Sequence, residues 1–203
     1  LLALASPELG VLGITTVAGD VPLALTTRNA CIMLELIGRQ DVPVYAGAIR
    51  PMVRPLVTAE FVHGKTGLDG PILQEPTMTP SSGDAVDFII RTLREQPARA
   101  VTLCPLGPLT NIALALVRAP DIAGKIAEIV LMGGGCFEGG NITPTAEFNI
   151  FVDPHAAEVV FKSGAPIVMM PLDVTHKVLT TRVRIAAIRG IGNRSGVVVA
   201  EML

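Results

Sequence analysis

The sequence predicts an α/β fold in which an open, mainly parallel sheet carries helices on both faces. Half of the 203 residues are hydrophobic and only 17% are charged, which suits strands covered on both sides. Short apolar segments rich in β-branched residues alternate with segments of helical periodicity. This alternation is typical of βαβ units, so we expect a Rossmann-like sheet within a single domain over residues 1–203.

The first predicted unit spans residues 10–45. Residues 10–17 form the expected strand, and residues 22–38 form a helix with apolar side chains at helical spacing and a glycine at its end. Residues 42–45 are a second short strand that closes the βαβ unit. Residues 1–6 resemble the second half of a helix, which stops before Pro7.

Residues 47–83 show no convincing periodicity and are rich in proline and glycine. A segment of this length without regular structure is rare in a compact domain. It is either disordered or a functional lid, and we favour the lid because long loops in such folds tend to cover sites.

Periodicity returns after residue 83. We expect a helix over residues 84–96, a strand over 100–104, and a helix over 109–117 after a Pro-Leu-Gly-Pro turn. A short helix over residues 121–127 then leads into the apolar strand 129–132.

The segment after that strand is the most informative of the chain. Gly133, Gly134 and Gly135 follow it directly, and their backbone would allow close approach of a ligand. Glu147 and Asn149 flank a phenylalanine, so in an extended segment both polar side chains would point the same way. A carboxylate beside a carboxamide is a plausible grip for vicinal hydroxyls.

The remaining elements follow from local signals. Asp153 followed by Pro154 is typical of a helix start, and Gly164 ends that helix. Residues 166–170 predict a strand, whereas residues 181–190 and those from 195 onward predict helices.

Composition excludes several classes of partner. A net charge of −2 leaves no electrostatic footprint for nucleic acid or an anionic membrane surface. No apolar run approaches the roughly 20 residues that span a bilayer. The three cysteines are odd in number and lack metal spacing, which favours a reducing, cytoplasmic location. We interpret Cys31, Cys104 and Cys136 as buried small hydrophobic side chains.

Several polar residues follow predicted strand ends, which share one edge of a parallel sheet. Some have other interpretations: Asp20 as the N-cap of the next helix, Asn141 as a turn residue, and His63 as a solvated loop side chain. A polar pair such as Glu147 and Asn149, set among apolar residues, costs burial energy unless it has partners. The pattern alone indicates an α/β enzyme or a binding protein for a small polyhydroxylated ligand.

Five motifs resemble those of the inosine-uridine preferring nucleoside hydrolases. They lie in residues 12–19, 63–70, 107–113, 131–150 and 171–176, and include Leu-Gly-Ile-Thr-Thr-Val-Ala-Gly, Gly-Pro-Leu-Thr-Asn-Ile-Ala and Thr-Ala-Glu-Phe-Asn-Ile. The match is collinear over essentially the whole chain. The resemblance implies the nucleoside hydrolase fold and cleavage of the N-glycosidic bond of purine or pyrimidine ribonucleosides, with a bound Ca²⁺ and an activated water. It further implies a role in nucleoside metabolism such as purine salvage, and assembly as a homodimer or homotetramer.

The resemblance also assigns roles to individual positions. It implies that Asn141, Glu147 and Asn149 surround the ribose hydroxyls and that Met132 packs near the sugar. His63 would lie in the loop that closes over the base, and the backbone carbonyl of Leu106 would be a calcium ligand. Asp20 stands where the family commonly has a sugar-contacting asparagine.

The family's catalytic and metal-binding carboxylates are not found in these 203 residues. The resemblance places an Asp-x-Asp-Pro-Gly-x-Asp-Asp motif before Leu1 and a His-Asp pair beyond Leu203, so we expect the chain to be truncated at both ends and inactive alone. Proton abstraction from a metal-bound water needs such a base. The alternative is a non-catalytic relative that binds nucleosides or ribose.

Overall fold

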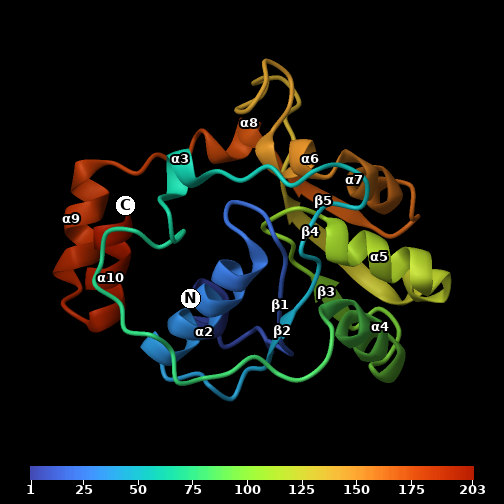
Figure 1. Cartoon of the computed structure of the whole chain (residues 1–203), viewed down its shortest axis with the longest axis horizontal. Coiled ribbons are helices and arrows are strands. Elements are labelled where there is room, and N and C mark those ends of the chain that lie inside the picture. The colour runs from blue at the N-terminus through green and yellow to red at the C-terminus, as the bar shows by residue number, and fades with distance from the viewer.

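The computed structural model describes all of residues 1–203 and has the predicted α/β architecture (Figure 1). The strands are β1 (Ile14–Thr16), β2 (Val44–Ala46), β3 (Val101–Leu103), β4 (Ile126–Met132) and β5 (Ile167–Met170). The helices are α1 (Leu2–Ala5), α2 (Leu23–Leu36), α3 (Glu60–His63), α4 (Ala85–Glu95), α5 (Thr110–Arg118), the 3₁₀ helix η1 (Pro120–Lys125), α6 (Phe148–Val152), α7 (Pro154–Phe161), α8 (Leu172–Thr175), α9 (Arg182–Gly190) and α10 (Arg194–Met202). None of these helices is long and apolar enough to span a bilayer.

All strand pairs are parallel, but they form two open sheets rather than one. β1 pairs with β2, and β4 lies between β3 and β5. α2 connects β1 to β2 as the expected βαβ crossover. The carboxyl ends of β4 and β5 lie in register, with Met132 opposite Met170. Their following loops therefore meet at one edge of the three-stranded sheet.

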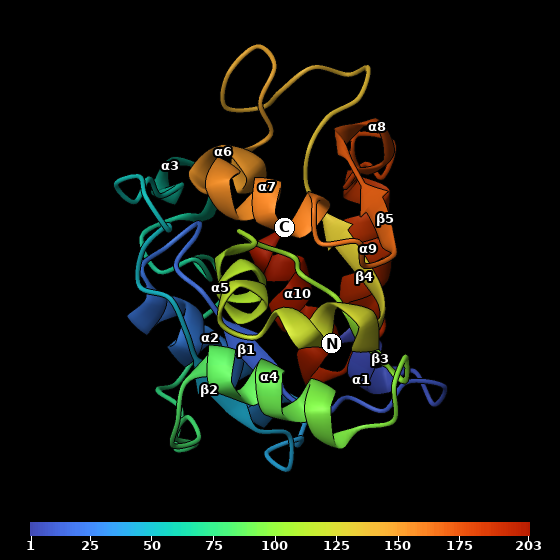
Figure 2. The same cartoon turned by 90° about the vertical axis from the view of Figure 1, so that its right-hand side faces the viewer.

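The main hydrophobic core lies on one face of that sheet. α4, α5 and α7 pack there, to the left of β3 and β4 in Figure 2, and the cluster contains 18 buried residues. β4 contributes Ile126, Ile129 and Leu131, which are at most 1% exposed. α9 and α10 form a helical hairpin at the opposite side of the molecule (Figure 1).

Side chains rather than strand hydrogen bonds connect the two sheets. The Asn111 carboxamide donates to the Thr16 carbonyl (2.8 Å) and accepts from the Ala48 backbone N–H (2.9 Å). A methyl group on Gly47 would overlap this carboxamide, so glycine permits the close approach. Tyr45 of β2 stacks on Phe88 of α4 with ring centroids 4.3 Å apart.

Helix starts with a strong local cap follow the sequence prediction. Asp84 accepts from the backbone N–H groups of Val86 and Asp87 and begins α4. Asp153 begins α7 and accepts from the Ala156 N–H. These carboxylates satisfy first-turn donors that would otherwise lack partners.

Three local features differ from the sequence-based expectation. Residues 148–152 form the short helix α6 instead of an extended segment, because the Glu147 carboxylate caps the Ile150 N–H. Asp20 does not cap α2, since its N-cap is Pro22 and no side chain caps this helix. The segment expected as a helix over residues 121–127 is the 3₁₀ helix η1, and β4 begins at Ile126, earlier than predicted.

The cysteine prediction is correct for only one of three residues. Cys31 is buried, and burial is the main cause that raises the pKa of its thiol. Cys104 and Cys136 are exposed, because they lie after β3 and in the glycine-rich loop after β4. All three are free thiols.

Candidate functional site

The candidate site lies at the carboxyl end of β4. Met132 ends this strand, residues 133–147 form a loop, and α6 returns the chain to the strand end. Glu147 and Asn149 are only 2% and 8% exposed, although they are polar. The ends of parallel strands are the usual place for ligands in open α/β sheets.

Glu147 is held by one of its two carboxylate oxygens. Oε2 accepts from the backbone N–H groups of Gly134 (3.0 Å) and Ile150 (3.1 Å). Oε1 has no hydrogen-bond partner in the chain. No fully buried side-chain oxygen or nitrogen lacks a partner, so Oε1 must reach the surface. A nearly buried carboxylate thus keeps one acceptor oxygen that has no partner in the chain.

Asn149 likewise bonds within the chain through only one of its two side-chain polar atoms. Its Nδ2 donates to the Met132 carbonyl (3.1 Å) and lies 3.3 Å from the Met132 sulfur. Its Oδ1 has no partner in the chain and, by the same argument, is accessible. Sequence reasoning expected these two residues to share a face of an extended segment. The structure brings them together with Met132 through the first turn of a helix instead.

Asn141 lies in the loop before α6 and is exposed. Its Oδ1 accepts from the Phe148 N–H (2.8 Å), and its own backbone N–H donates to the Ala146 carbonyl (3.1 Å). The residue therefore joins the two ends of the turn that leads into α6, as a turn residue would. Its Nδ2 donor remains available beside the start of the helix.

Asp20 and His63 form a separate pair. Asp20 follows β1, and its carboxylate lies 3.6 Å from the His63 Nε2 at the end of α3. The Asp20 carbonyl also accepts from the Ala59 N–H (2.8 Å), so the turn that begins α3 is docked on this loop. Both side chains are 46% exposed. The contact places the loop histidine beside the position where the family resemblance expects a sugar contact.

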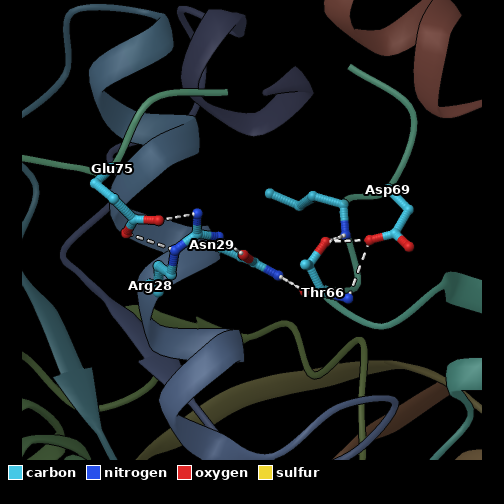
Figure 3. A network of polar contacts seen from close by, with 6 residues as sticks. Arg28, Asn29, Thr66, Asp69 and Glu75 are labelled. Carbon is cyan, nitrogen blue, oxygen red and sulfur yellow. Dashed lines mark hydrogen bonds and ion pairs between the residues drawn. The ribbon is translucent and has the colours of Figure 1, made fainter. Parts of the chain in front are cut away.

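Residues 47–83 are tied to the rest of the chain at several points, although they contain only α3. Figure 3 shows Arg28 of α2 paired in a fork with Glu75, and Asn29 donating to the Thr66 carbonyl (2.7 Å). Asp69 accepts from the backbone N–H of Thr66 (3.0 Å) and folds the tip of the loop onto itself. The segment thus has a defined conformation, and its role as a lid stays a prediction.

Two buried polar residues fix the start of that segment. Asp153 is fully buried and accepts from the Met52 N–H (2.9 Å) and the Thr110 hydroxyl (2.7 Å) in addition to its capping bond. Asn111 holds Ala48 in the same way. Sequence reasoning identified Asp153 only as a helix cap, because its partners are far away along the chain.

The chain offers little to a calcium ion. The Leu106 carbonyl accepts no hydrogen bond within the chain, so this oxygen is free to coordinate a cation. No group of three or more His, Cys, Asp or Glu residues is placed to hold a metal. Ca²⁺ takes six to eight oxygen ligands and binds more tightly as charged ligands are added. The residues present therefore do not make up a calcium site by themselves.

Asp173 is one of the polar residues that sequence reasoning placed at a strand end, without assigning it a contact. It lies in the first turn of α8 and accepts from the backbone N–H groups of Cys136 (2.7 Å) and Phe137 (2.8 Å). These hydrogen bonds, above all that from Cys136, hold the pKa of its carboxyl below the usual range. Asp173 thereby binds the glycine-rich loop to the end of β5.

Comparison with known proteins gives matches over the whole chain. The family model for inosine-uridine preferring nucleoside hydrolases matches residues 1–203. The chain is 55% identical over 203 residues to an uncharacterized protein of Schizosaccharomyces pombe, covering 100% of this chain and 66% of that protein. It is 52% identical over 202 residues to the pyrimidine-specific ribonucleoside hydrolase RihA of Salmonella typhimurium, covering 100% of this chain and 64% of the relative.

Solved structures give the same result. A purine-preferring ribonucleoside hydrolase from Gardnerella vaginalis superimposes with a TM-score of 0.94 at 36% identity, over 98% of this chain and 64% of that one. The plant nucleoside hydrolase PpNRh1 gives a TM-score of 0.89 at 36% identity, over 98% and 63% of the two chains. The chain thus spans about two thirds of the length of the relatives it matches.

Proposed function

The chain belongs to the inosine-uridine preferring nucleoside hydrolase family, and from this premise we propose that the full-length protein hydrolyses the N-glycosidic bond of ribonucleosides to free base and ribose. One observation carries the proposal beyond family membership. Two nearly buried side chains, Glu147 and Asn149, each keep one oxygen unpartnered and accessible at the end of β4. Such a pair is suited to accept hydrogen bonds from neighbouring sugar hydroxyls.

The geometry supports a specific role for each residue. Glu147 Oε1 accepts from one ribose hydroxyl, and Asn149 Oδ1 accepts from a second. Glycoside hydrolysis passes through an oxocarbenium-like transition state, in which the sugar ring gains positive charge. A fixed carboxylate close to the ring favours that state over the neutral substrate, which is the condition for raising the rate. Met132 and the glycines after it form the floor against which the sugar packs.

The pair of Asp20 and His63 extends the proposal to the nucleobase of the substrate. His63 stands at the end of α3 beside Asp20, and we place it over the nucleobase when substrate is bound. Asp20 then contacts His63 or the sugar in place of the asparagine usual in the family. The relatives do not give a common base preference, because one is named pyrimidine-specific and another purine-preferring. We propose only that a ribonucleoside is the substrate.

Ca²⁺ and self-association are proposals for the full-length protein. The Leu106 carbonyl is the one ligand that this chain offers, and the carboxylates needed for tight binding must come from other residues. We derive no chemical step from the metal. Assembly as a homodimer or homotetramer rests on the family resemblance alone.

The test is ribose release from uridine, cytidine, inosine and guanosine by the full-length protein, with and without a calcium chelator. We expect turnover of at least one nucleoside and its loss on chelation. Binding of ribose or a nucleoside without any turnover would refute the hydrolase and support the non-catalytic binding relative. Turnover that survives complete removal of Ca²⁺ would remove the metal from the proposal while leaving the reaction in place.

A further inference from the structure

Asp173 holds the middle of the glycine-rich loop after β4 with both of its carboxylate oxygens. Asp173 Oδ2 accepts from the Cys136 N–H at 2.7 Å, and Oδ1 accepts from the Phe137 N–H at 2.8 Å. Both oxygens are therefore occupied by backbone donors of one loop. Bonds from backbone N–H groups to a carboxylate are charge-assisted and stronger than neutral ones.

This contact lies one step from the carboxylate of the candidate site. The residue before Asp173, Leu172, donates its backbone N–H to the Gly134 carbonyl (2.9 Å). The Gly134 N–H in turn donates to Glu147 Oε2 (3.0 Å). Gly134 has a positive φ of 77° and lies close to Met169, so its peptide orientation depends on the loop being held.

We propose that Asp173 is a positioning residue for the Glu147 carboxylate. By fixing residues 136 and 137 to α8, it sets the direction of the Gly134 N–H and thereby leaves Glu147 Oε1 aimed at the ligand. The inference rests on the proposed hydrolase function, because Glu147 is taken as the sugar-binding carboxylate. The two backbone hydrogen bonds account for the position of Asp173 through contacts within the chain alone.

The experiment compares Asp173→Asn with Asp84→Asn in the full-length protein. Asparagine keeps one acceptor but turns its amide donors toward a second backbone N–H, so one of the two bonds is lost. Asp84→Asn is the control for the loss of charge alone: Asp84 Oδ1 accepts both of its backbone N–H groups, so asparagine can keep both bonds, and α4 contributes nothing to the candidate site. kcat and KM are measured with the best nucleoside of the panel, and amide hydrogen exchange is followed at Gly134.

We expect Asp173→Asn to lower kcat about tenfold or more while KM changes by less than about threefold, because misalignment weakens mainly the transition-state contact. Asp84→Asn should leave both constants within about twofold of the wild type. In the Glu147→Gln background, Asp173→Asn should cause little further loss, since the two residues act through one contact. Exchange at the Gly134 amide should accelerate in Asp173→Asn only.

Three results would overturn the proposal. These are wild-type kcat in Asp173→Asn, an equal loss in Asp84→Asn, or independent losses that multiply in the double variant. A wild-type protein that hydrolyses no nucleoside would instead refute the proposed function. In that case the exchange of Gly134 still decides whether Asp173 holds the loop, and unchanged exchange would end the positioning role as well.

Discussion

Replacement of Glu147 by glutamine separates its structural role from its proposed chemical role. A single oxygen, Oε2, accepts both backbone hydrogen bonds, from Gly134 and Ile150. The glutamine oxygen can take over both bonds, which places the NH₂ group where Oε1 reaches the surface. The variant therefore keeps the cap of α6 but presents a neutral donor to the sugar instead of a charged acceptor. Alanine would also remove the cap, which typically costs about 1 kcal/mol of stability.

The size of the effect follows from the bond that is lost. A hydrogen bond to a charged group contributes about 1.5–3 kcal/mol, and more when it strengthens in the transition state. At about 1.4 kcal/mol for each factor of ten, kcat/KM should fall by a factor of about 10 to 150. The free energy of unfolding should change by less than about 1 kcal/mol, because both structural bonds remain.

The assay is ribose release by the full-length variant, together with urea denaturation. Glu158→Gln is the matched control, because Glu158 is exposed on α7 and pairs only with Lys162. It should leave kcat/KM unchanged. A Glu147→Gln enzyme with wild-type kcat/KM would show that this carboxylate does not contact the sugar. A large loss of stability in the same variant would show that glutamine cannot replace the two structural bonds.

Three further predictions concern the fold and the metal. Asp153→Ala should lower the free energy of unfolding by about 3 kcal/mol or more, because it leaves two buried donors and one part-buried donor without an acceptor; a change below about 1 kcal/mol in urea denaturation would contradict this. The 203-residue chain alone should bind Ca²⁺ no better than the millimolar range, since it offers no cluster of carboxylates. It should also associate through its unpaired strand edges. Micromolar affinity by calorimetry, in a sample that stays monodisperse in sedimentation, would refute both expectations. The hydrogen bond from the Thr66 hydroxyl is the main cause that lowers the pKa of Asp69 in the folded chain. The charged carboxylate therefore stabilises the fold above its unfolded pKa of about 4. This contribution is lost as the pH falls through the lowered pKa of the folded state. The urea midpoint of Asp69→Asn should therefore depend less on pH below about 4 than that of the wild type, and identical profiles would exclude the effect.

Local signals in the sequence predicted the elements that carry their own caps. The helix starts at Asp84 and Asp153 were predicted correctly, because the capping carboxylate and the donors it satisfies are neighbours along the chain. The parallel pairing was predicted from the alternation of strands and helices. The division into two sheets was not, since periodicity does not specify which strand edges meet.

The candidate site was predicted in composition but not in geometry. Glu147 and Asn149 stood out because polar residues within an apolar run need partners. Their partners, Gly134 and Met132, come from the preceding strand end, 13 and 17 residues earlier. These contacts turned the segment into a helix, which no local pattern indicated.

The buried links were the hardest features to predict. Asn111 bonds Ala48 and Thr16, which lie 63 and 95 residues away in sequence. A single asparagine in a helical pattern gives no sign of such partners, and only the folded arrangement supplies them. The role of Asp173 was missed for the same reason, since its donors lie 37 and 36 residues earlier.

The separation of the two sheets affects which part of the chain can unfold locally. The unit of β1, β2 and α2 has a small core cluster of four residues, whereas the three-stranded unit has 18. Within residues 1–203 no strand ladder joins the two units, so in this chain the smaller one can unfold locally at lower free energy, in the manner of a separate foldon. Asp20 and the docking point of α3 belong to this smaller unit, whereas Glu147 and Asn149 belong to the larger one. Local opening of the first unit would therefore displace Asp20 and α3 while Glu147 and Asn149 keep their positions in the larger unit.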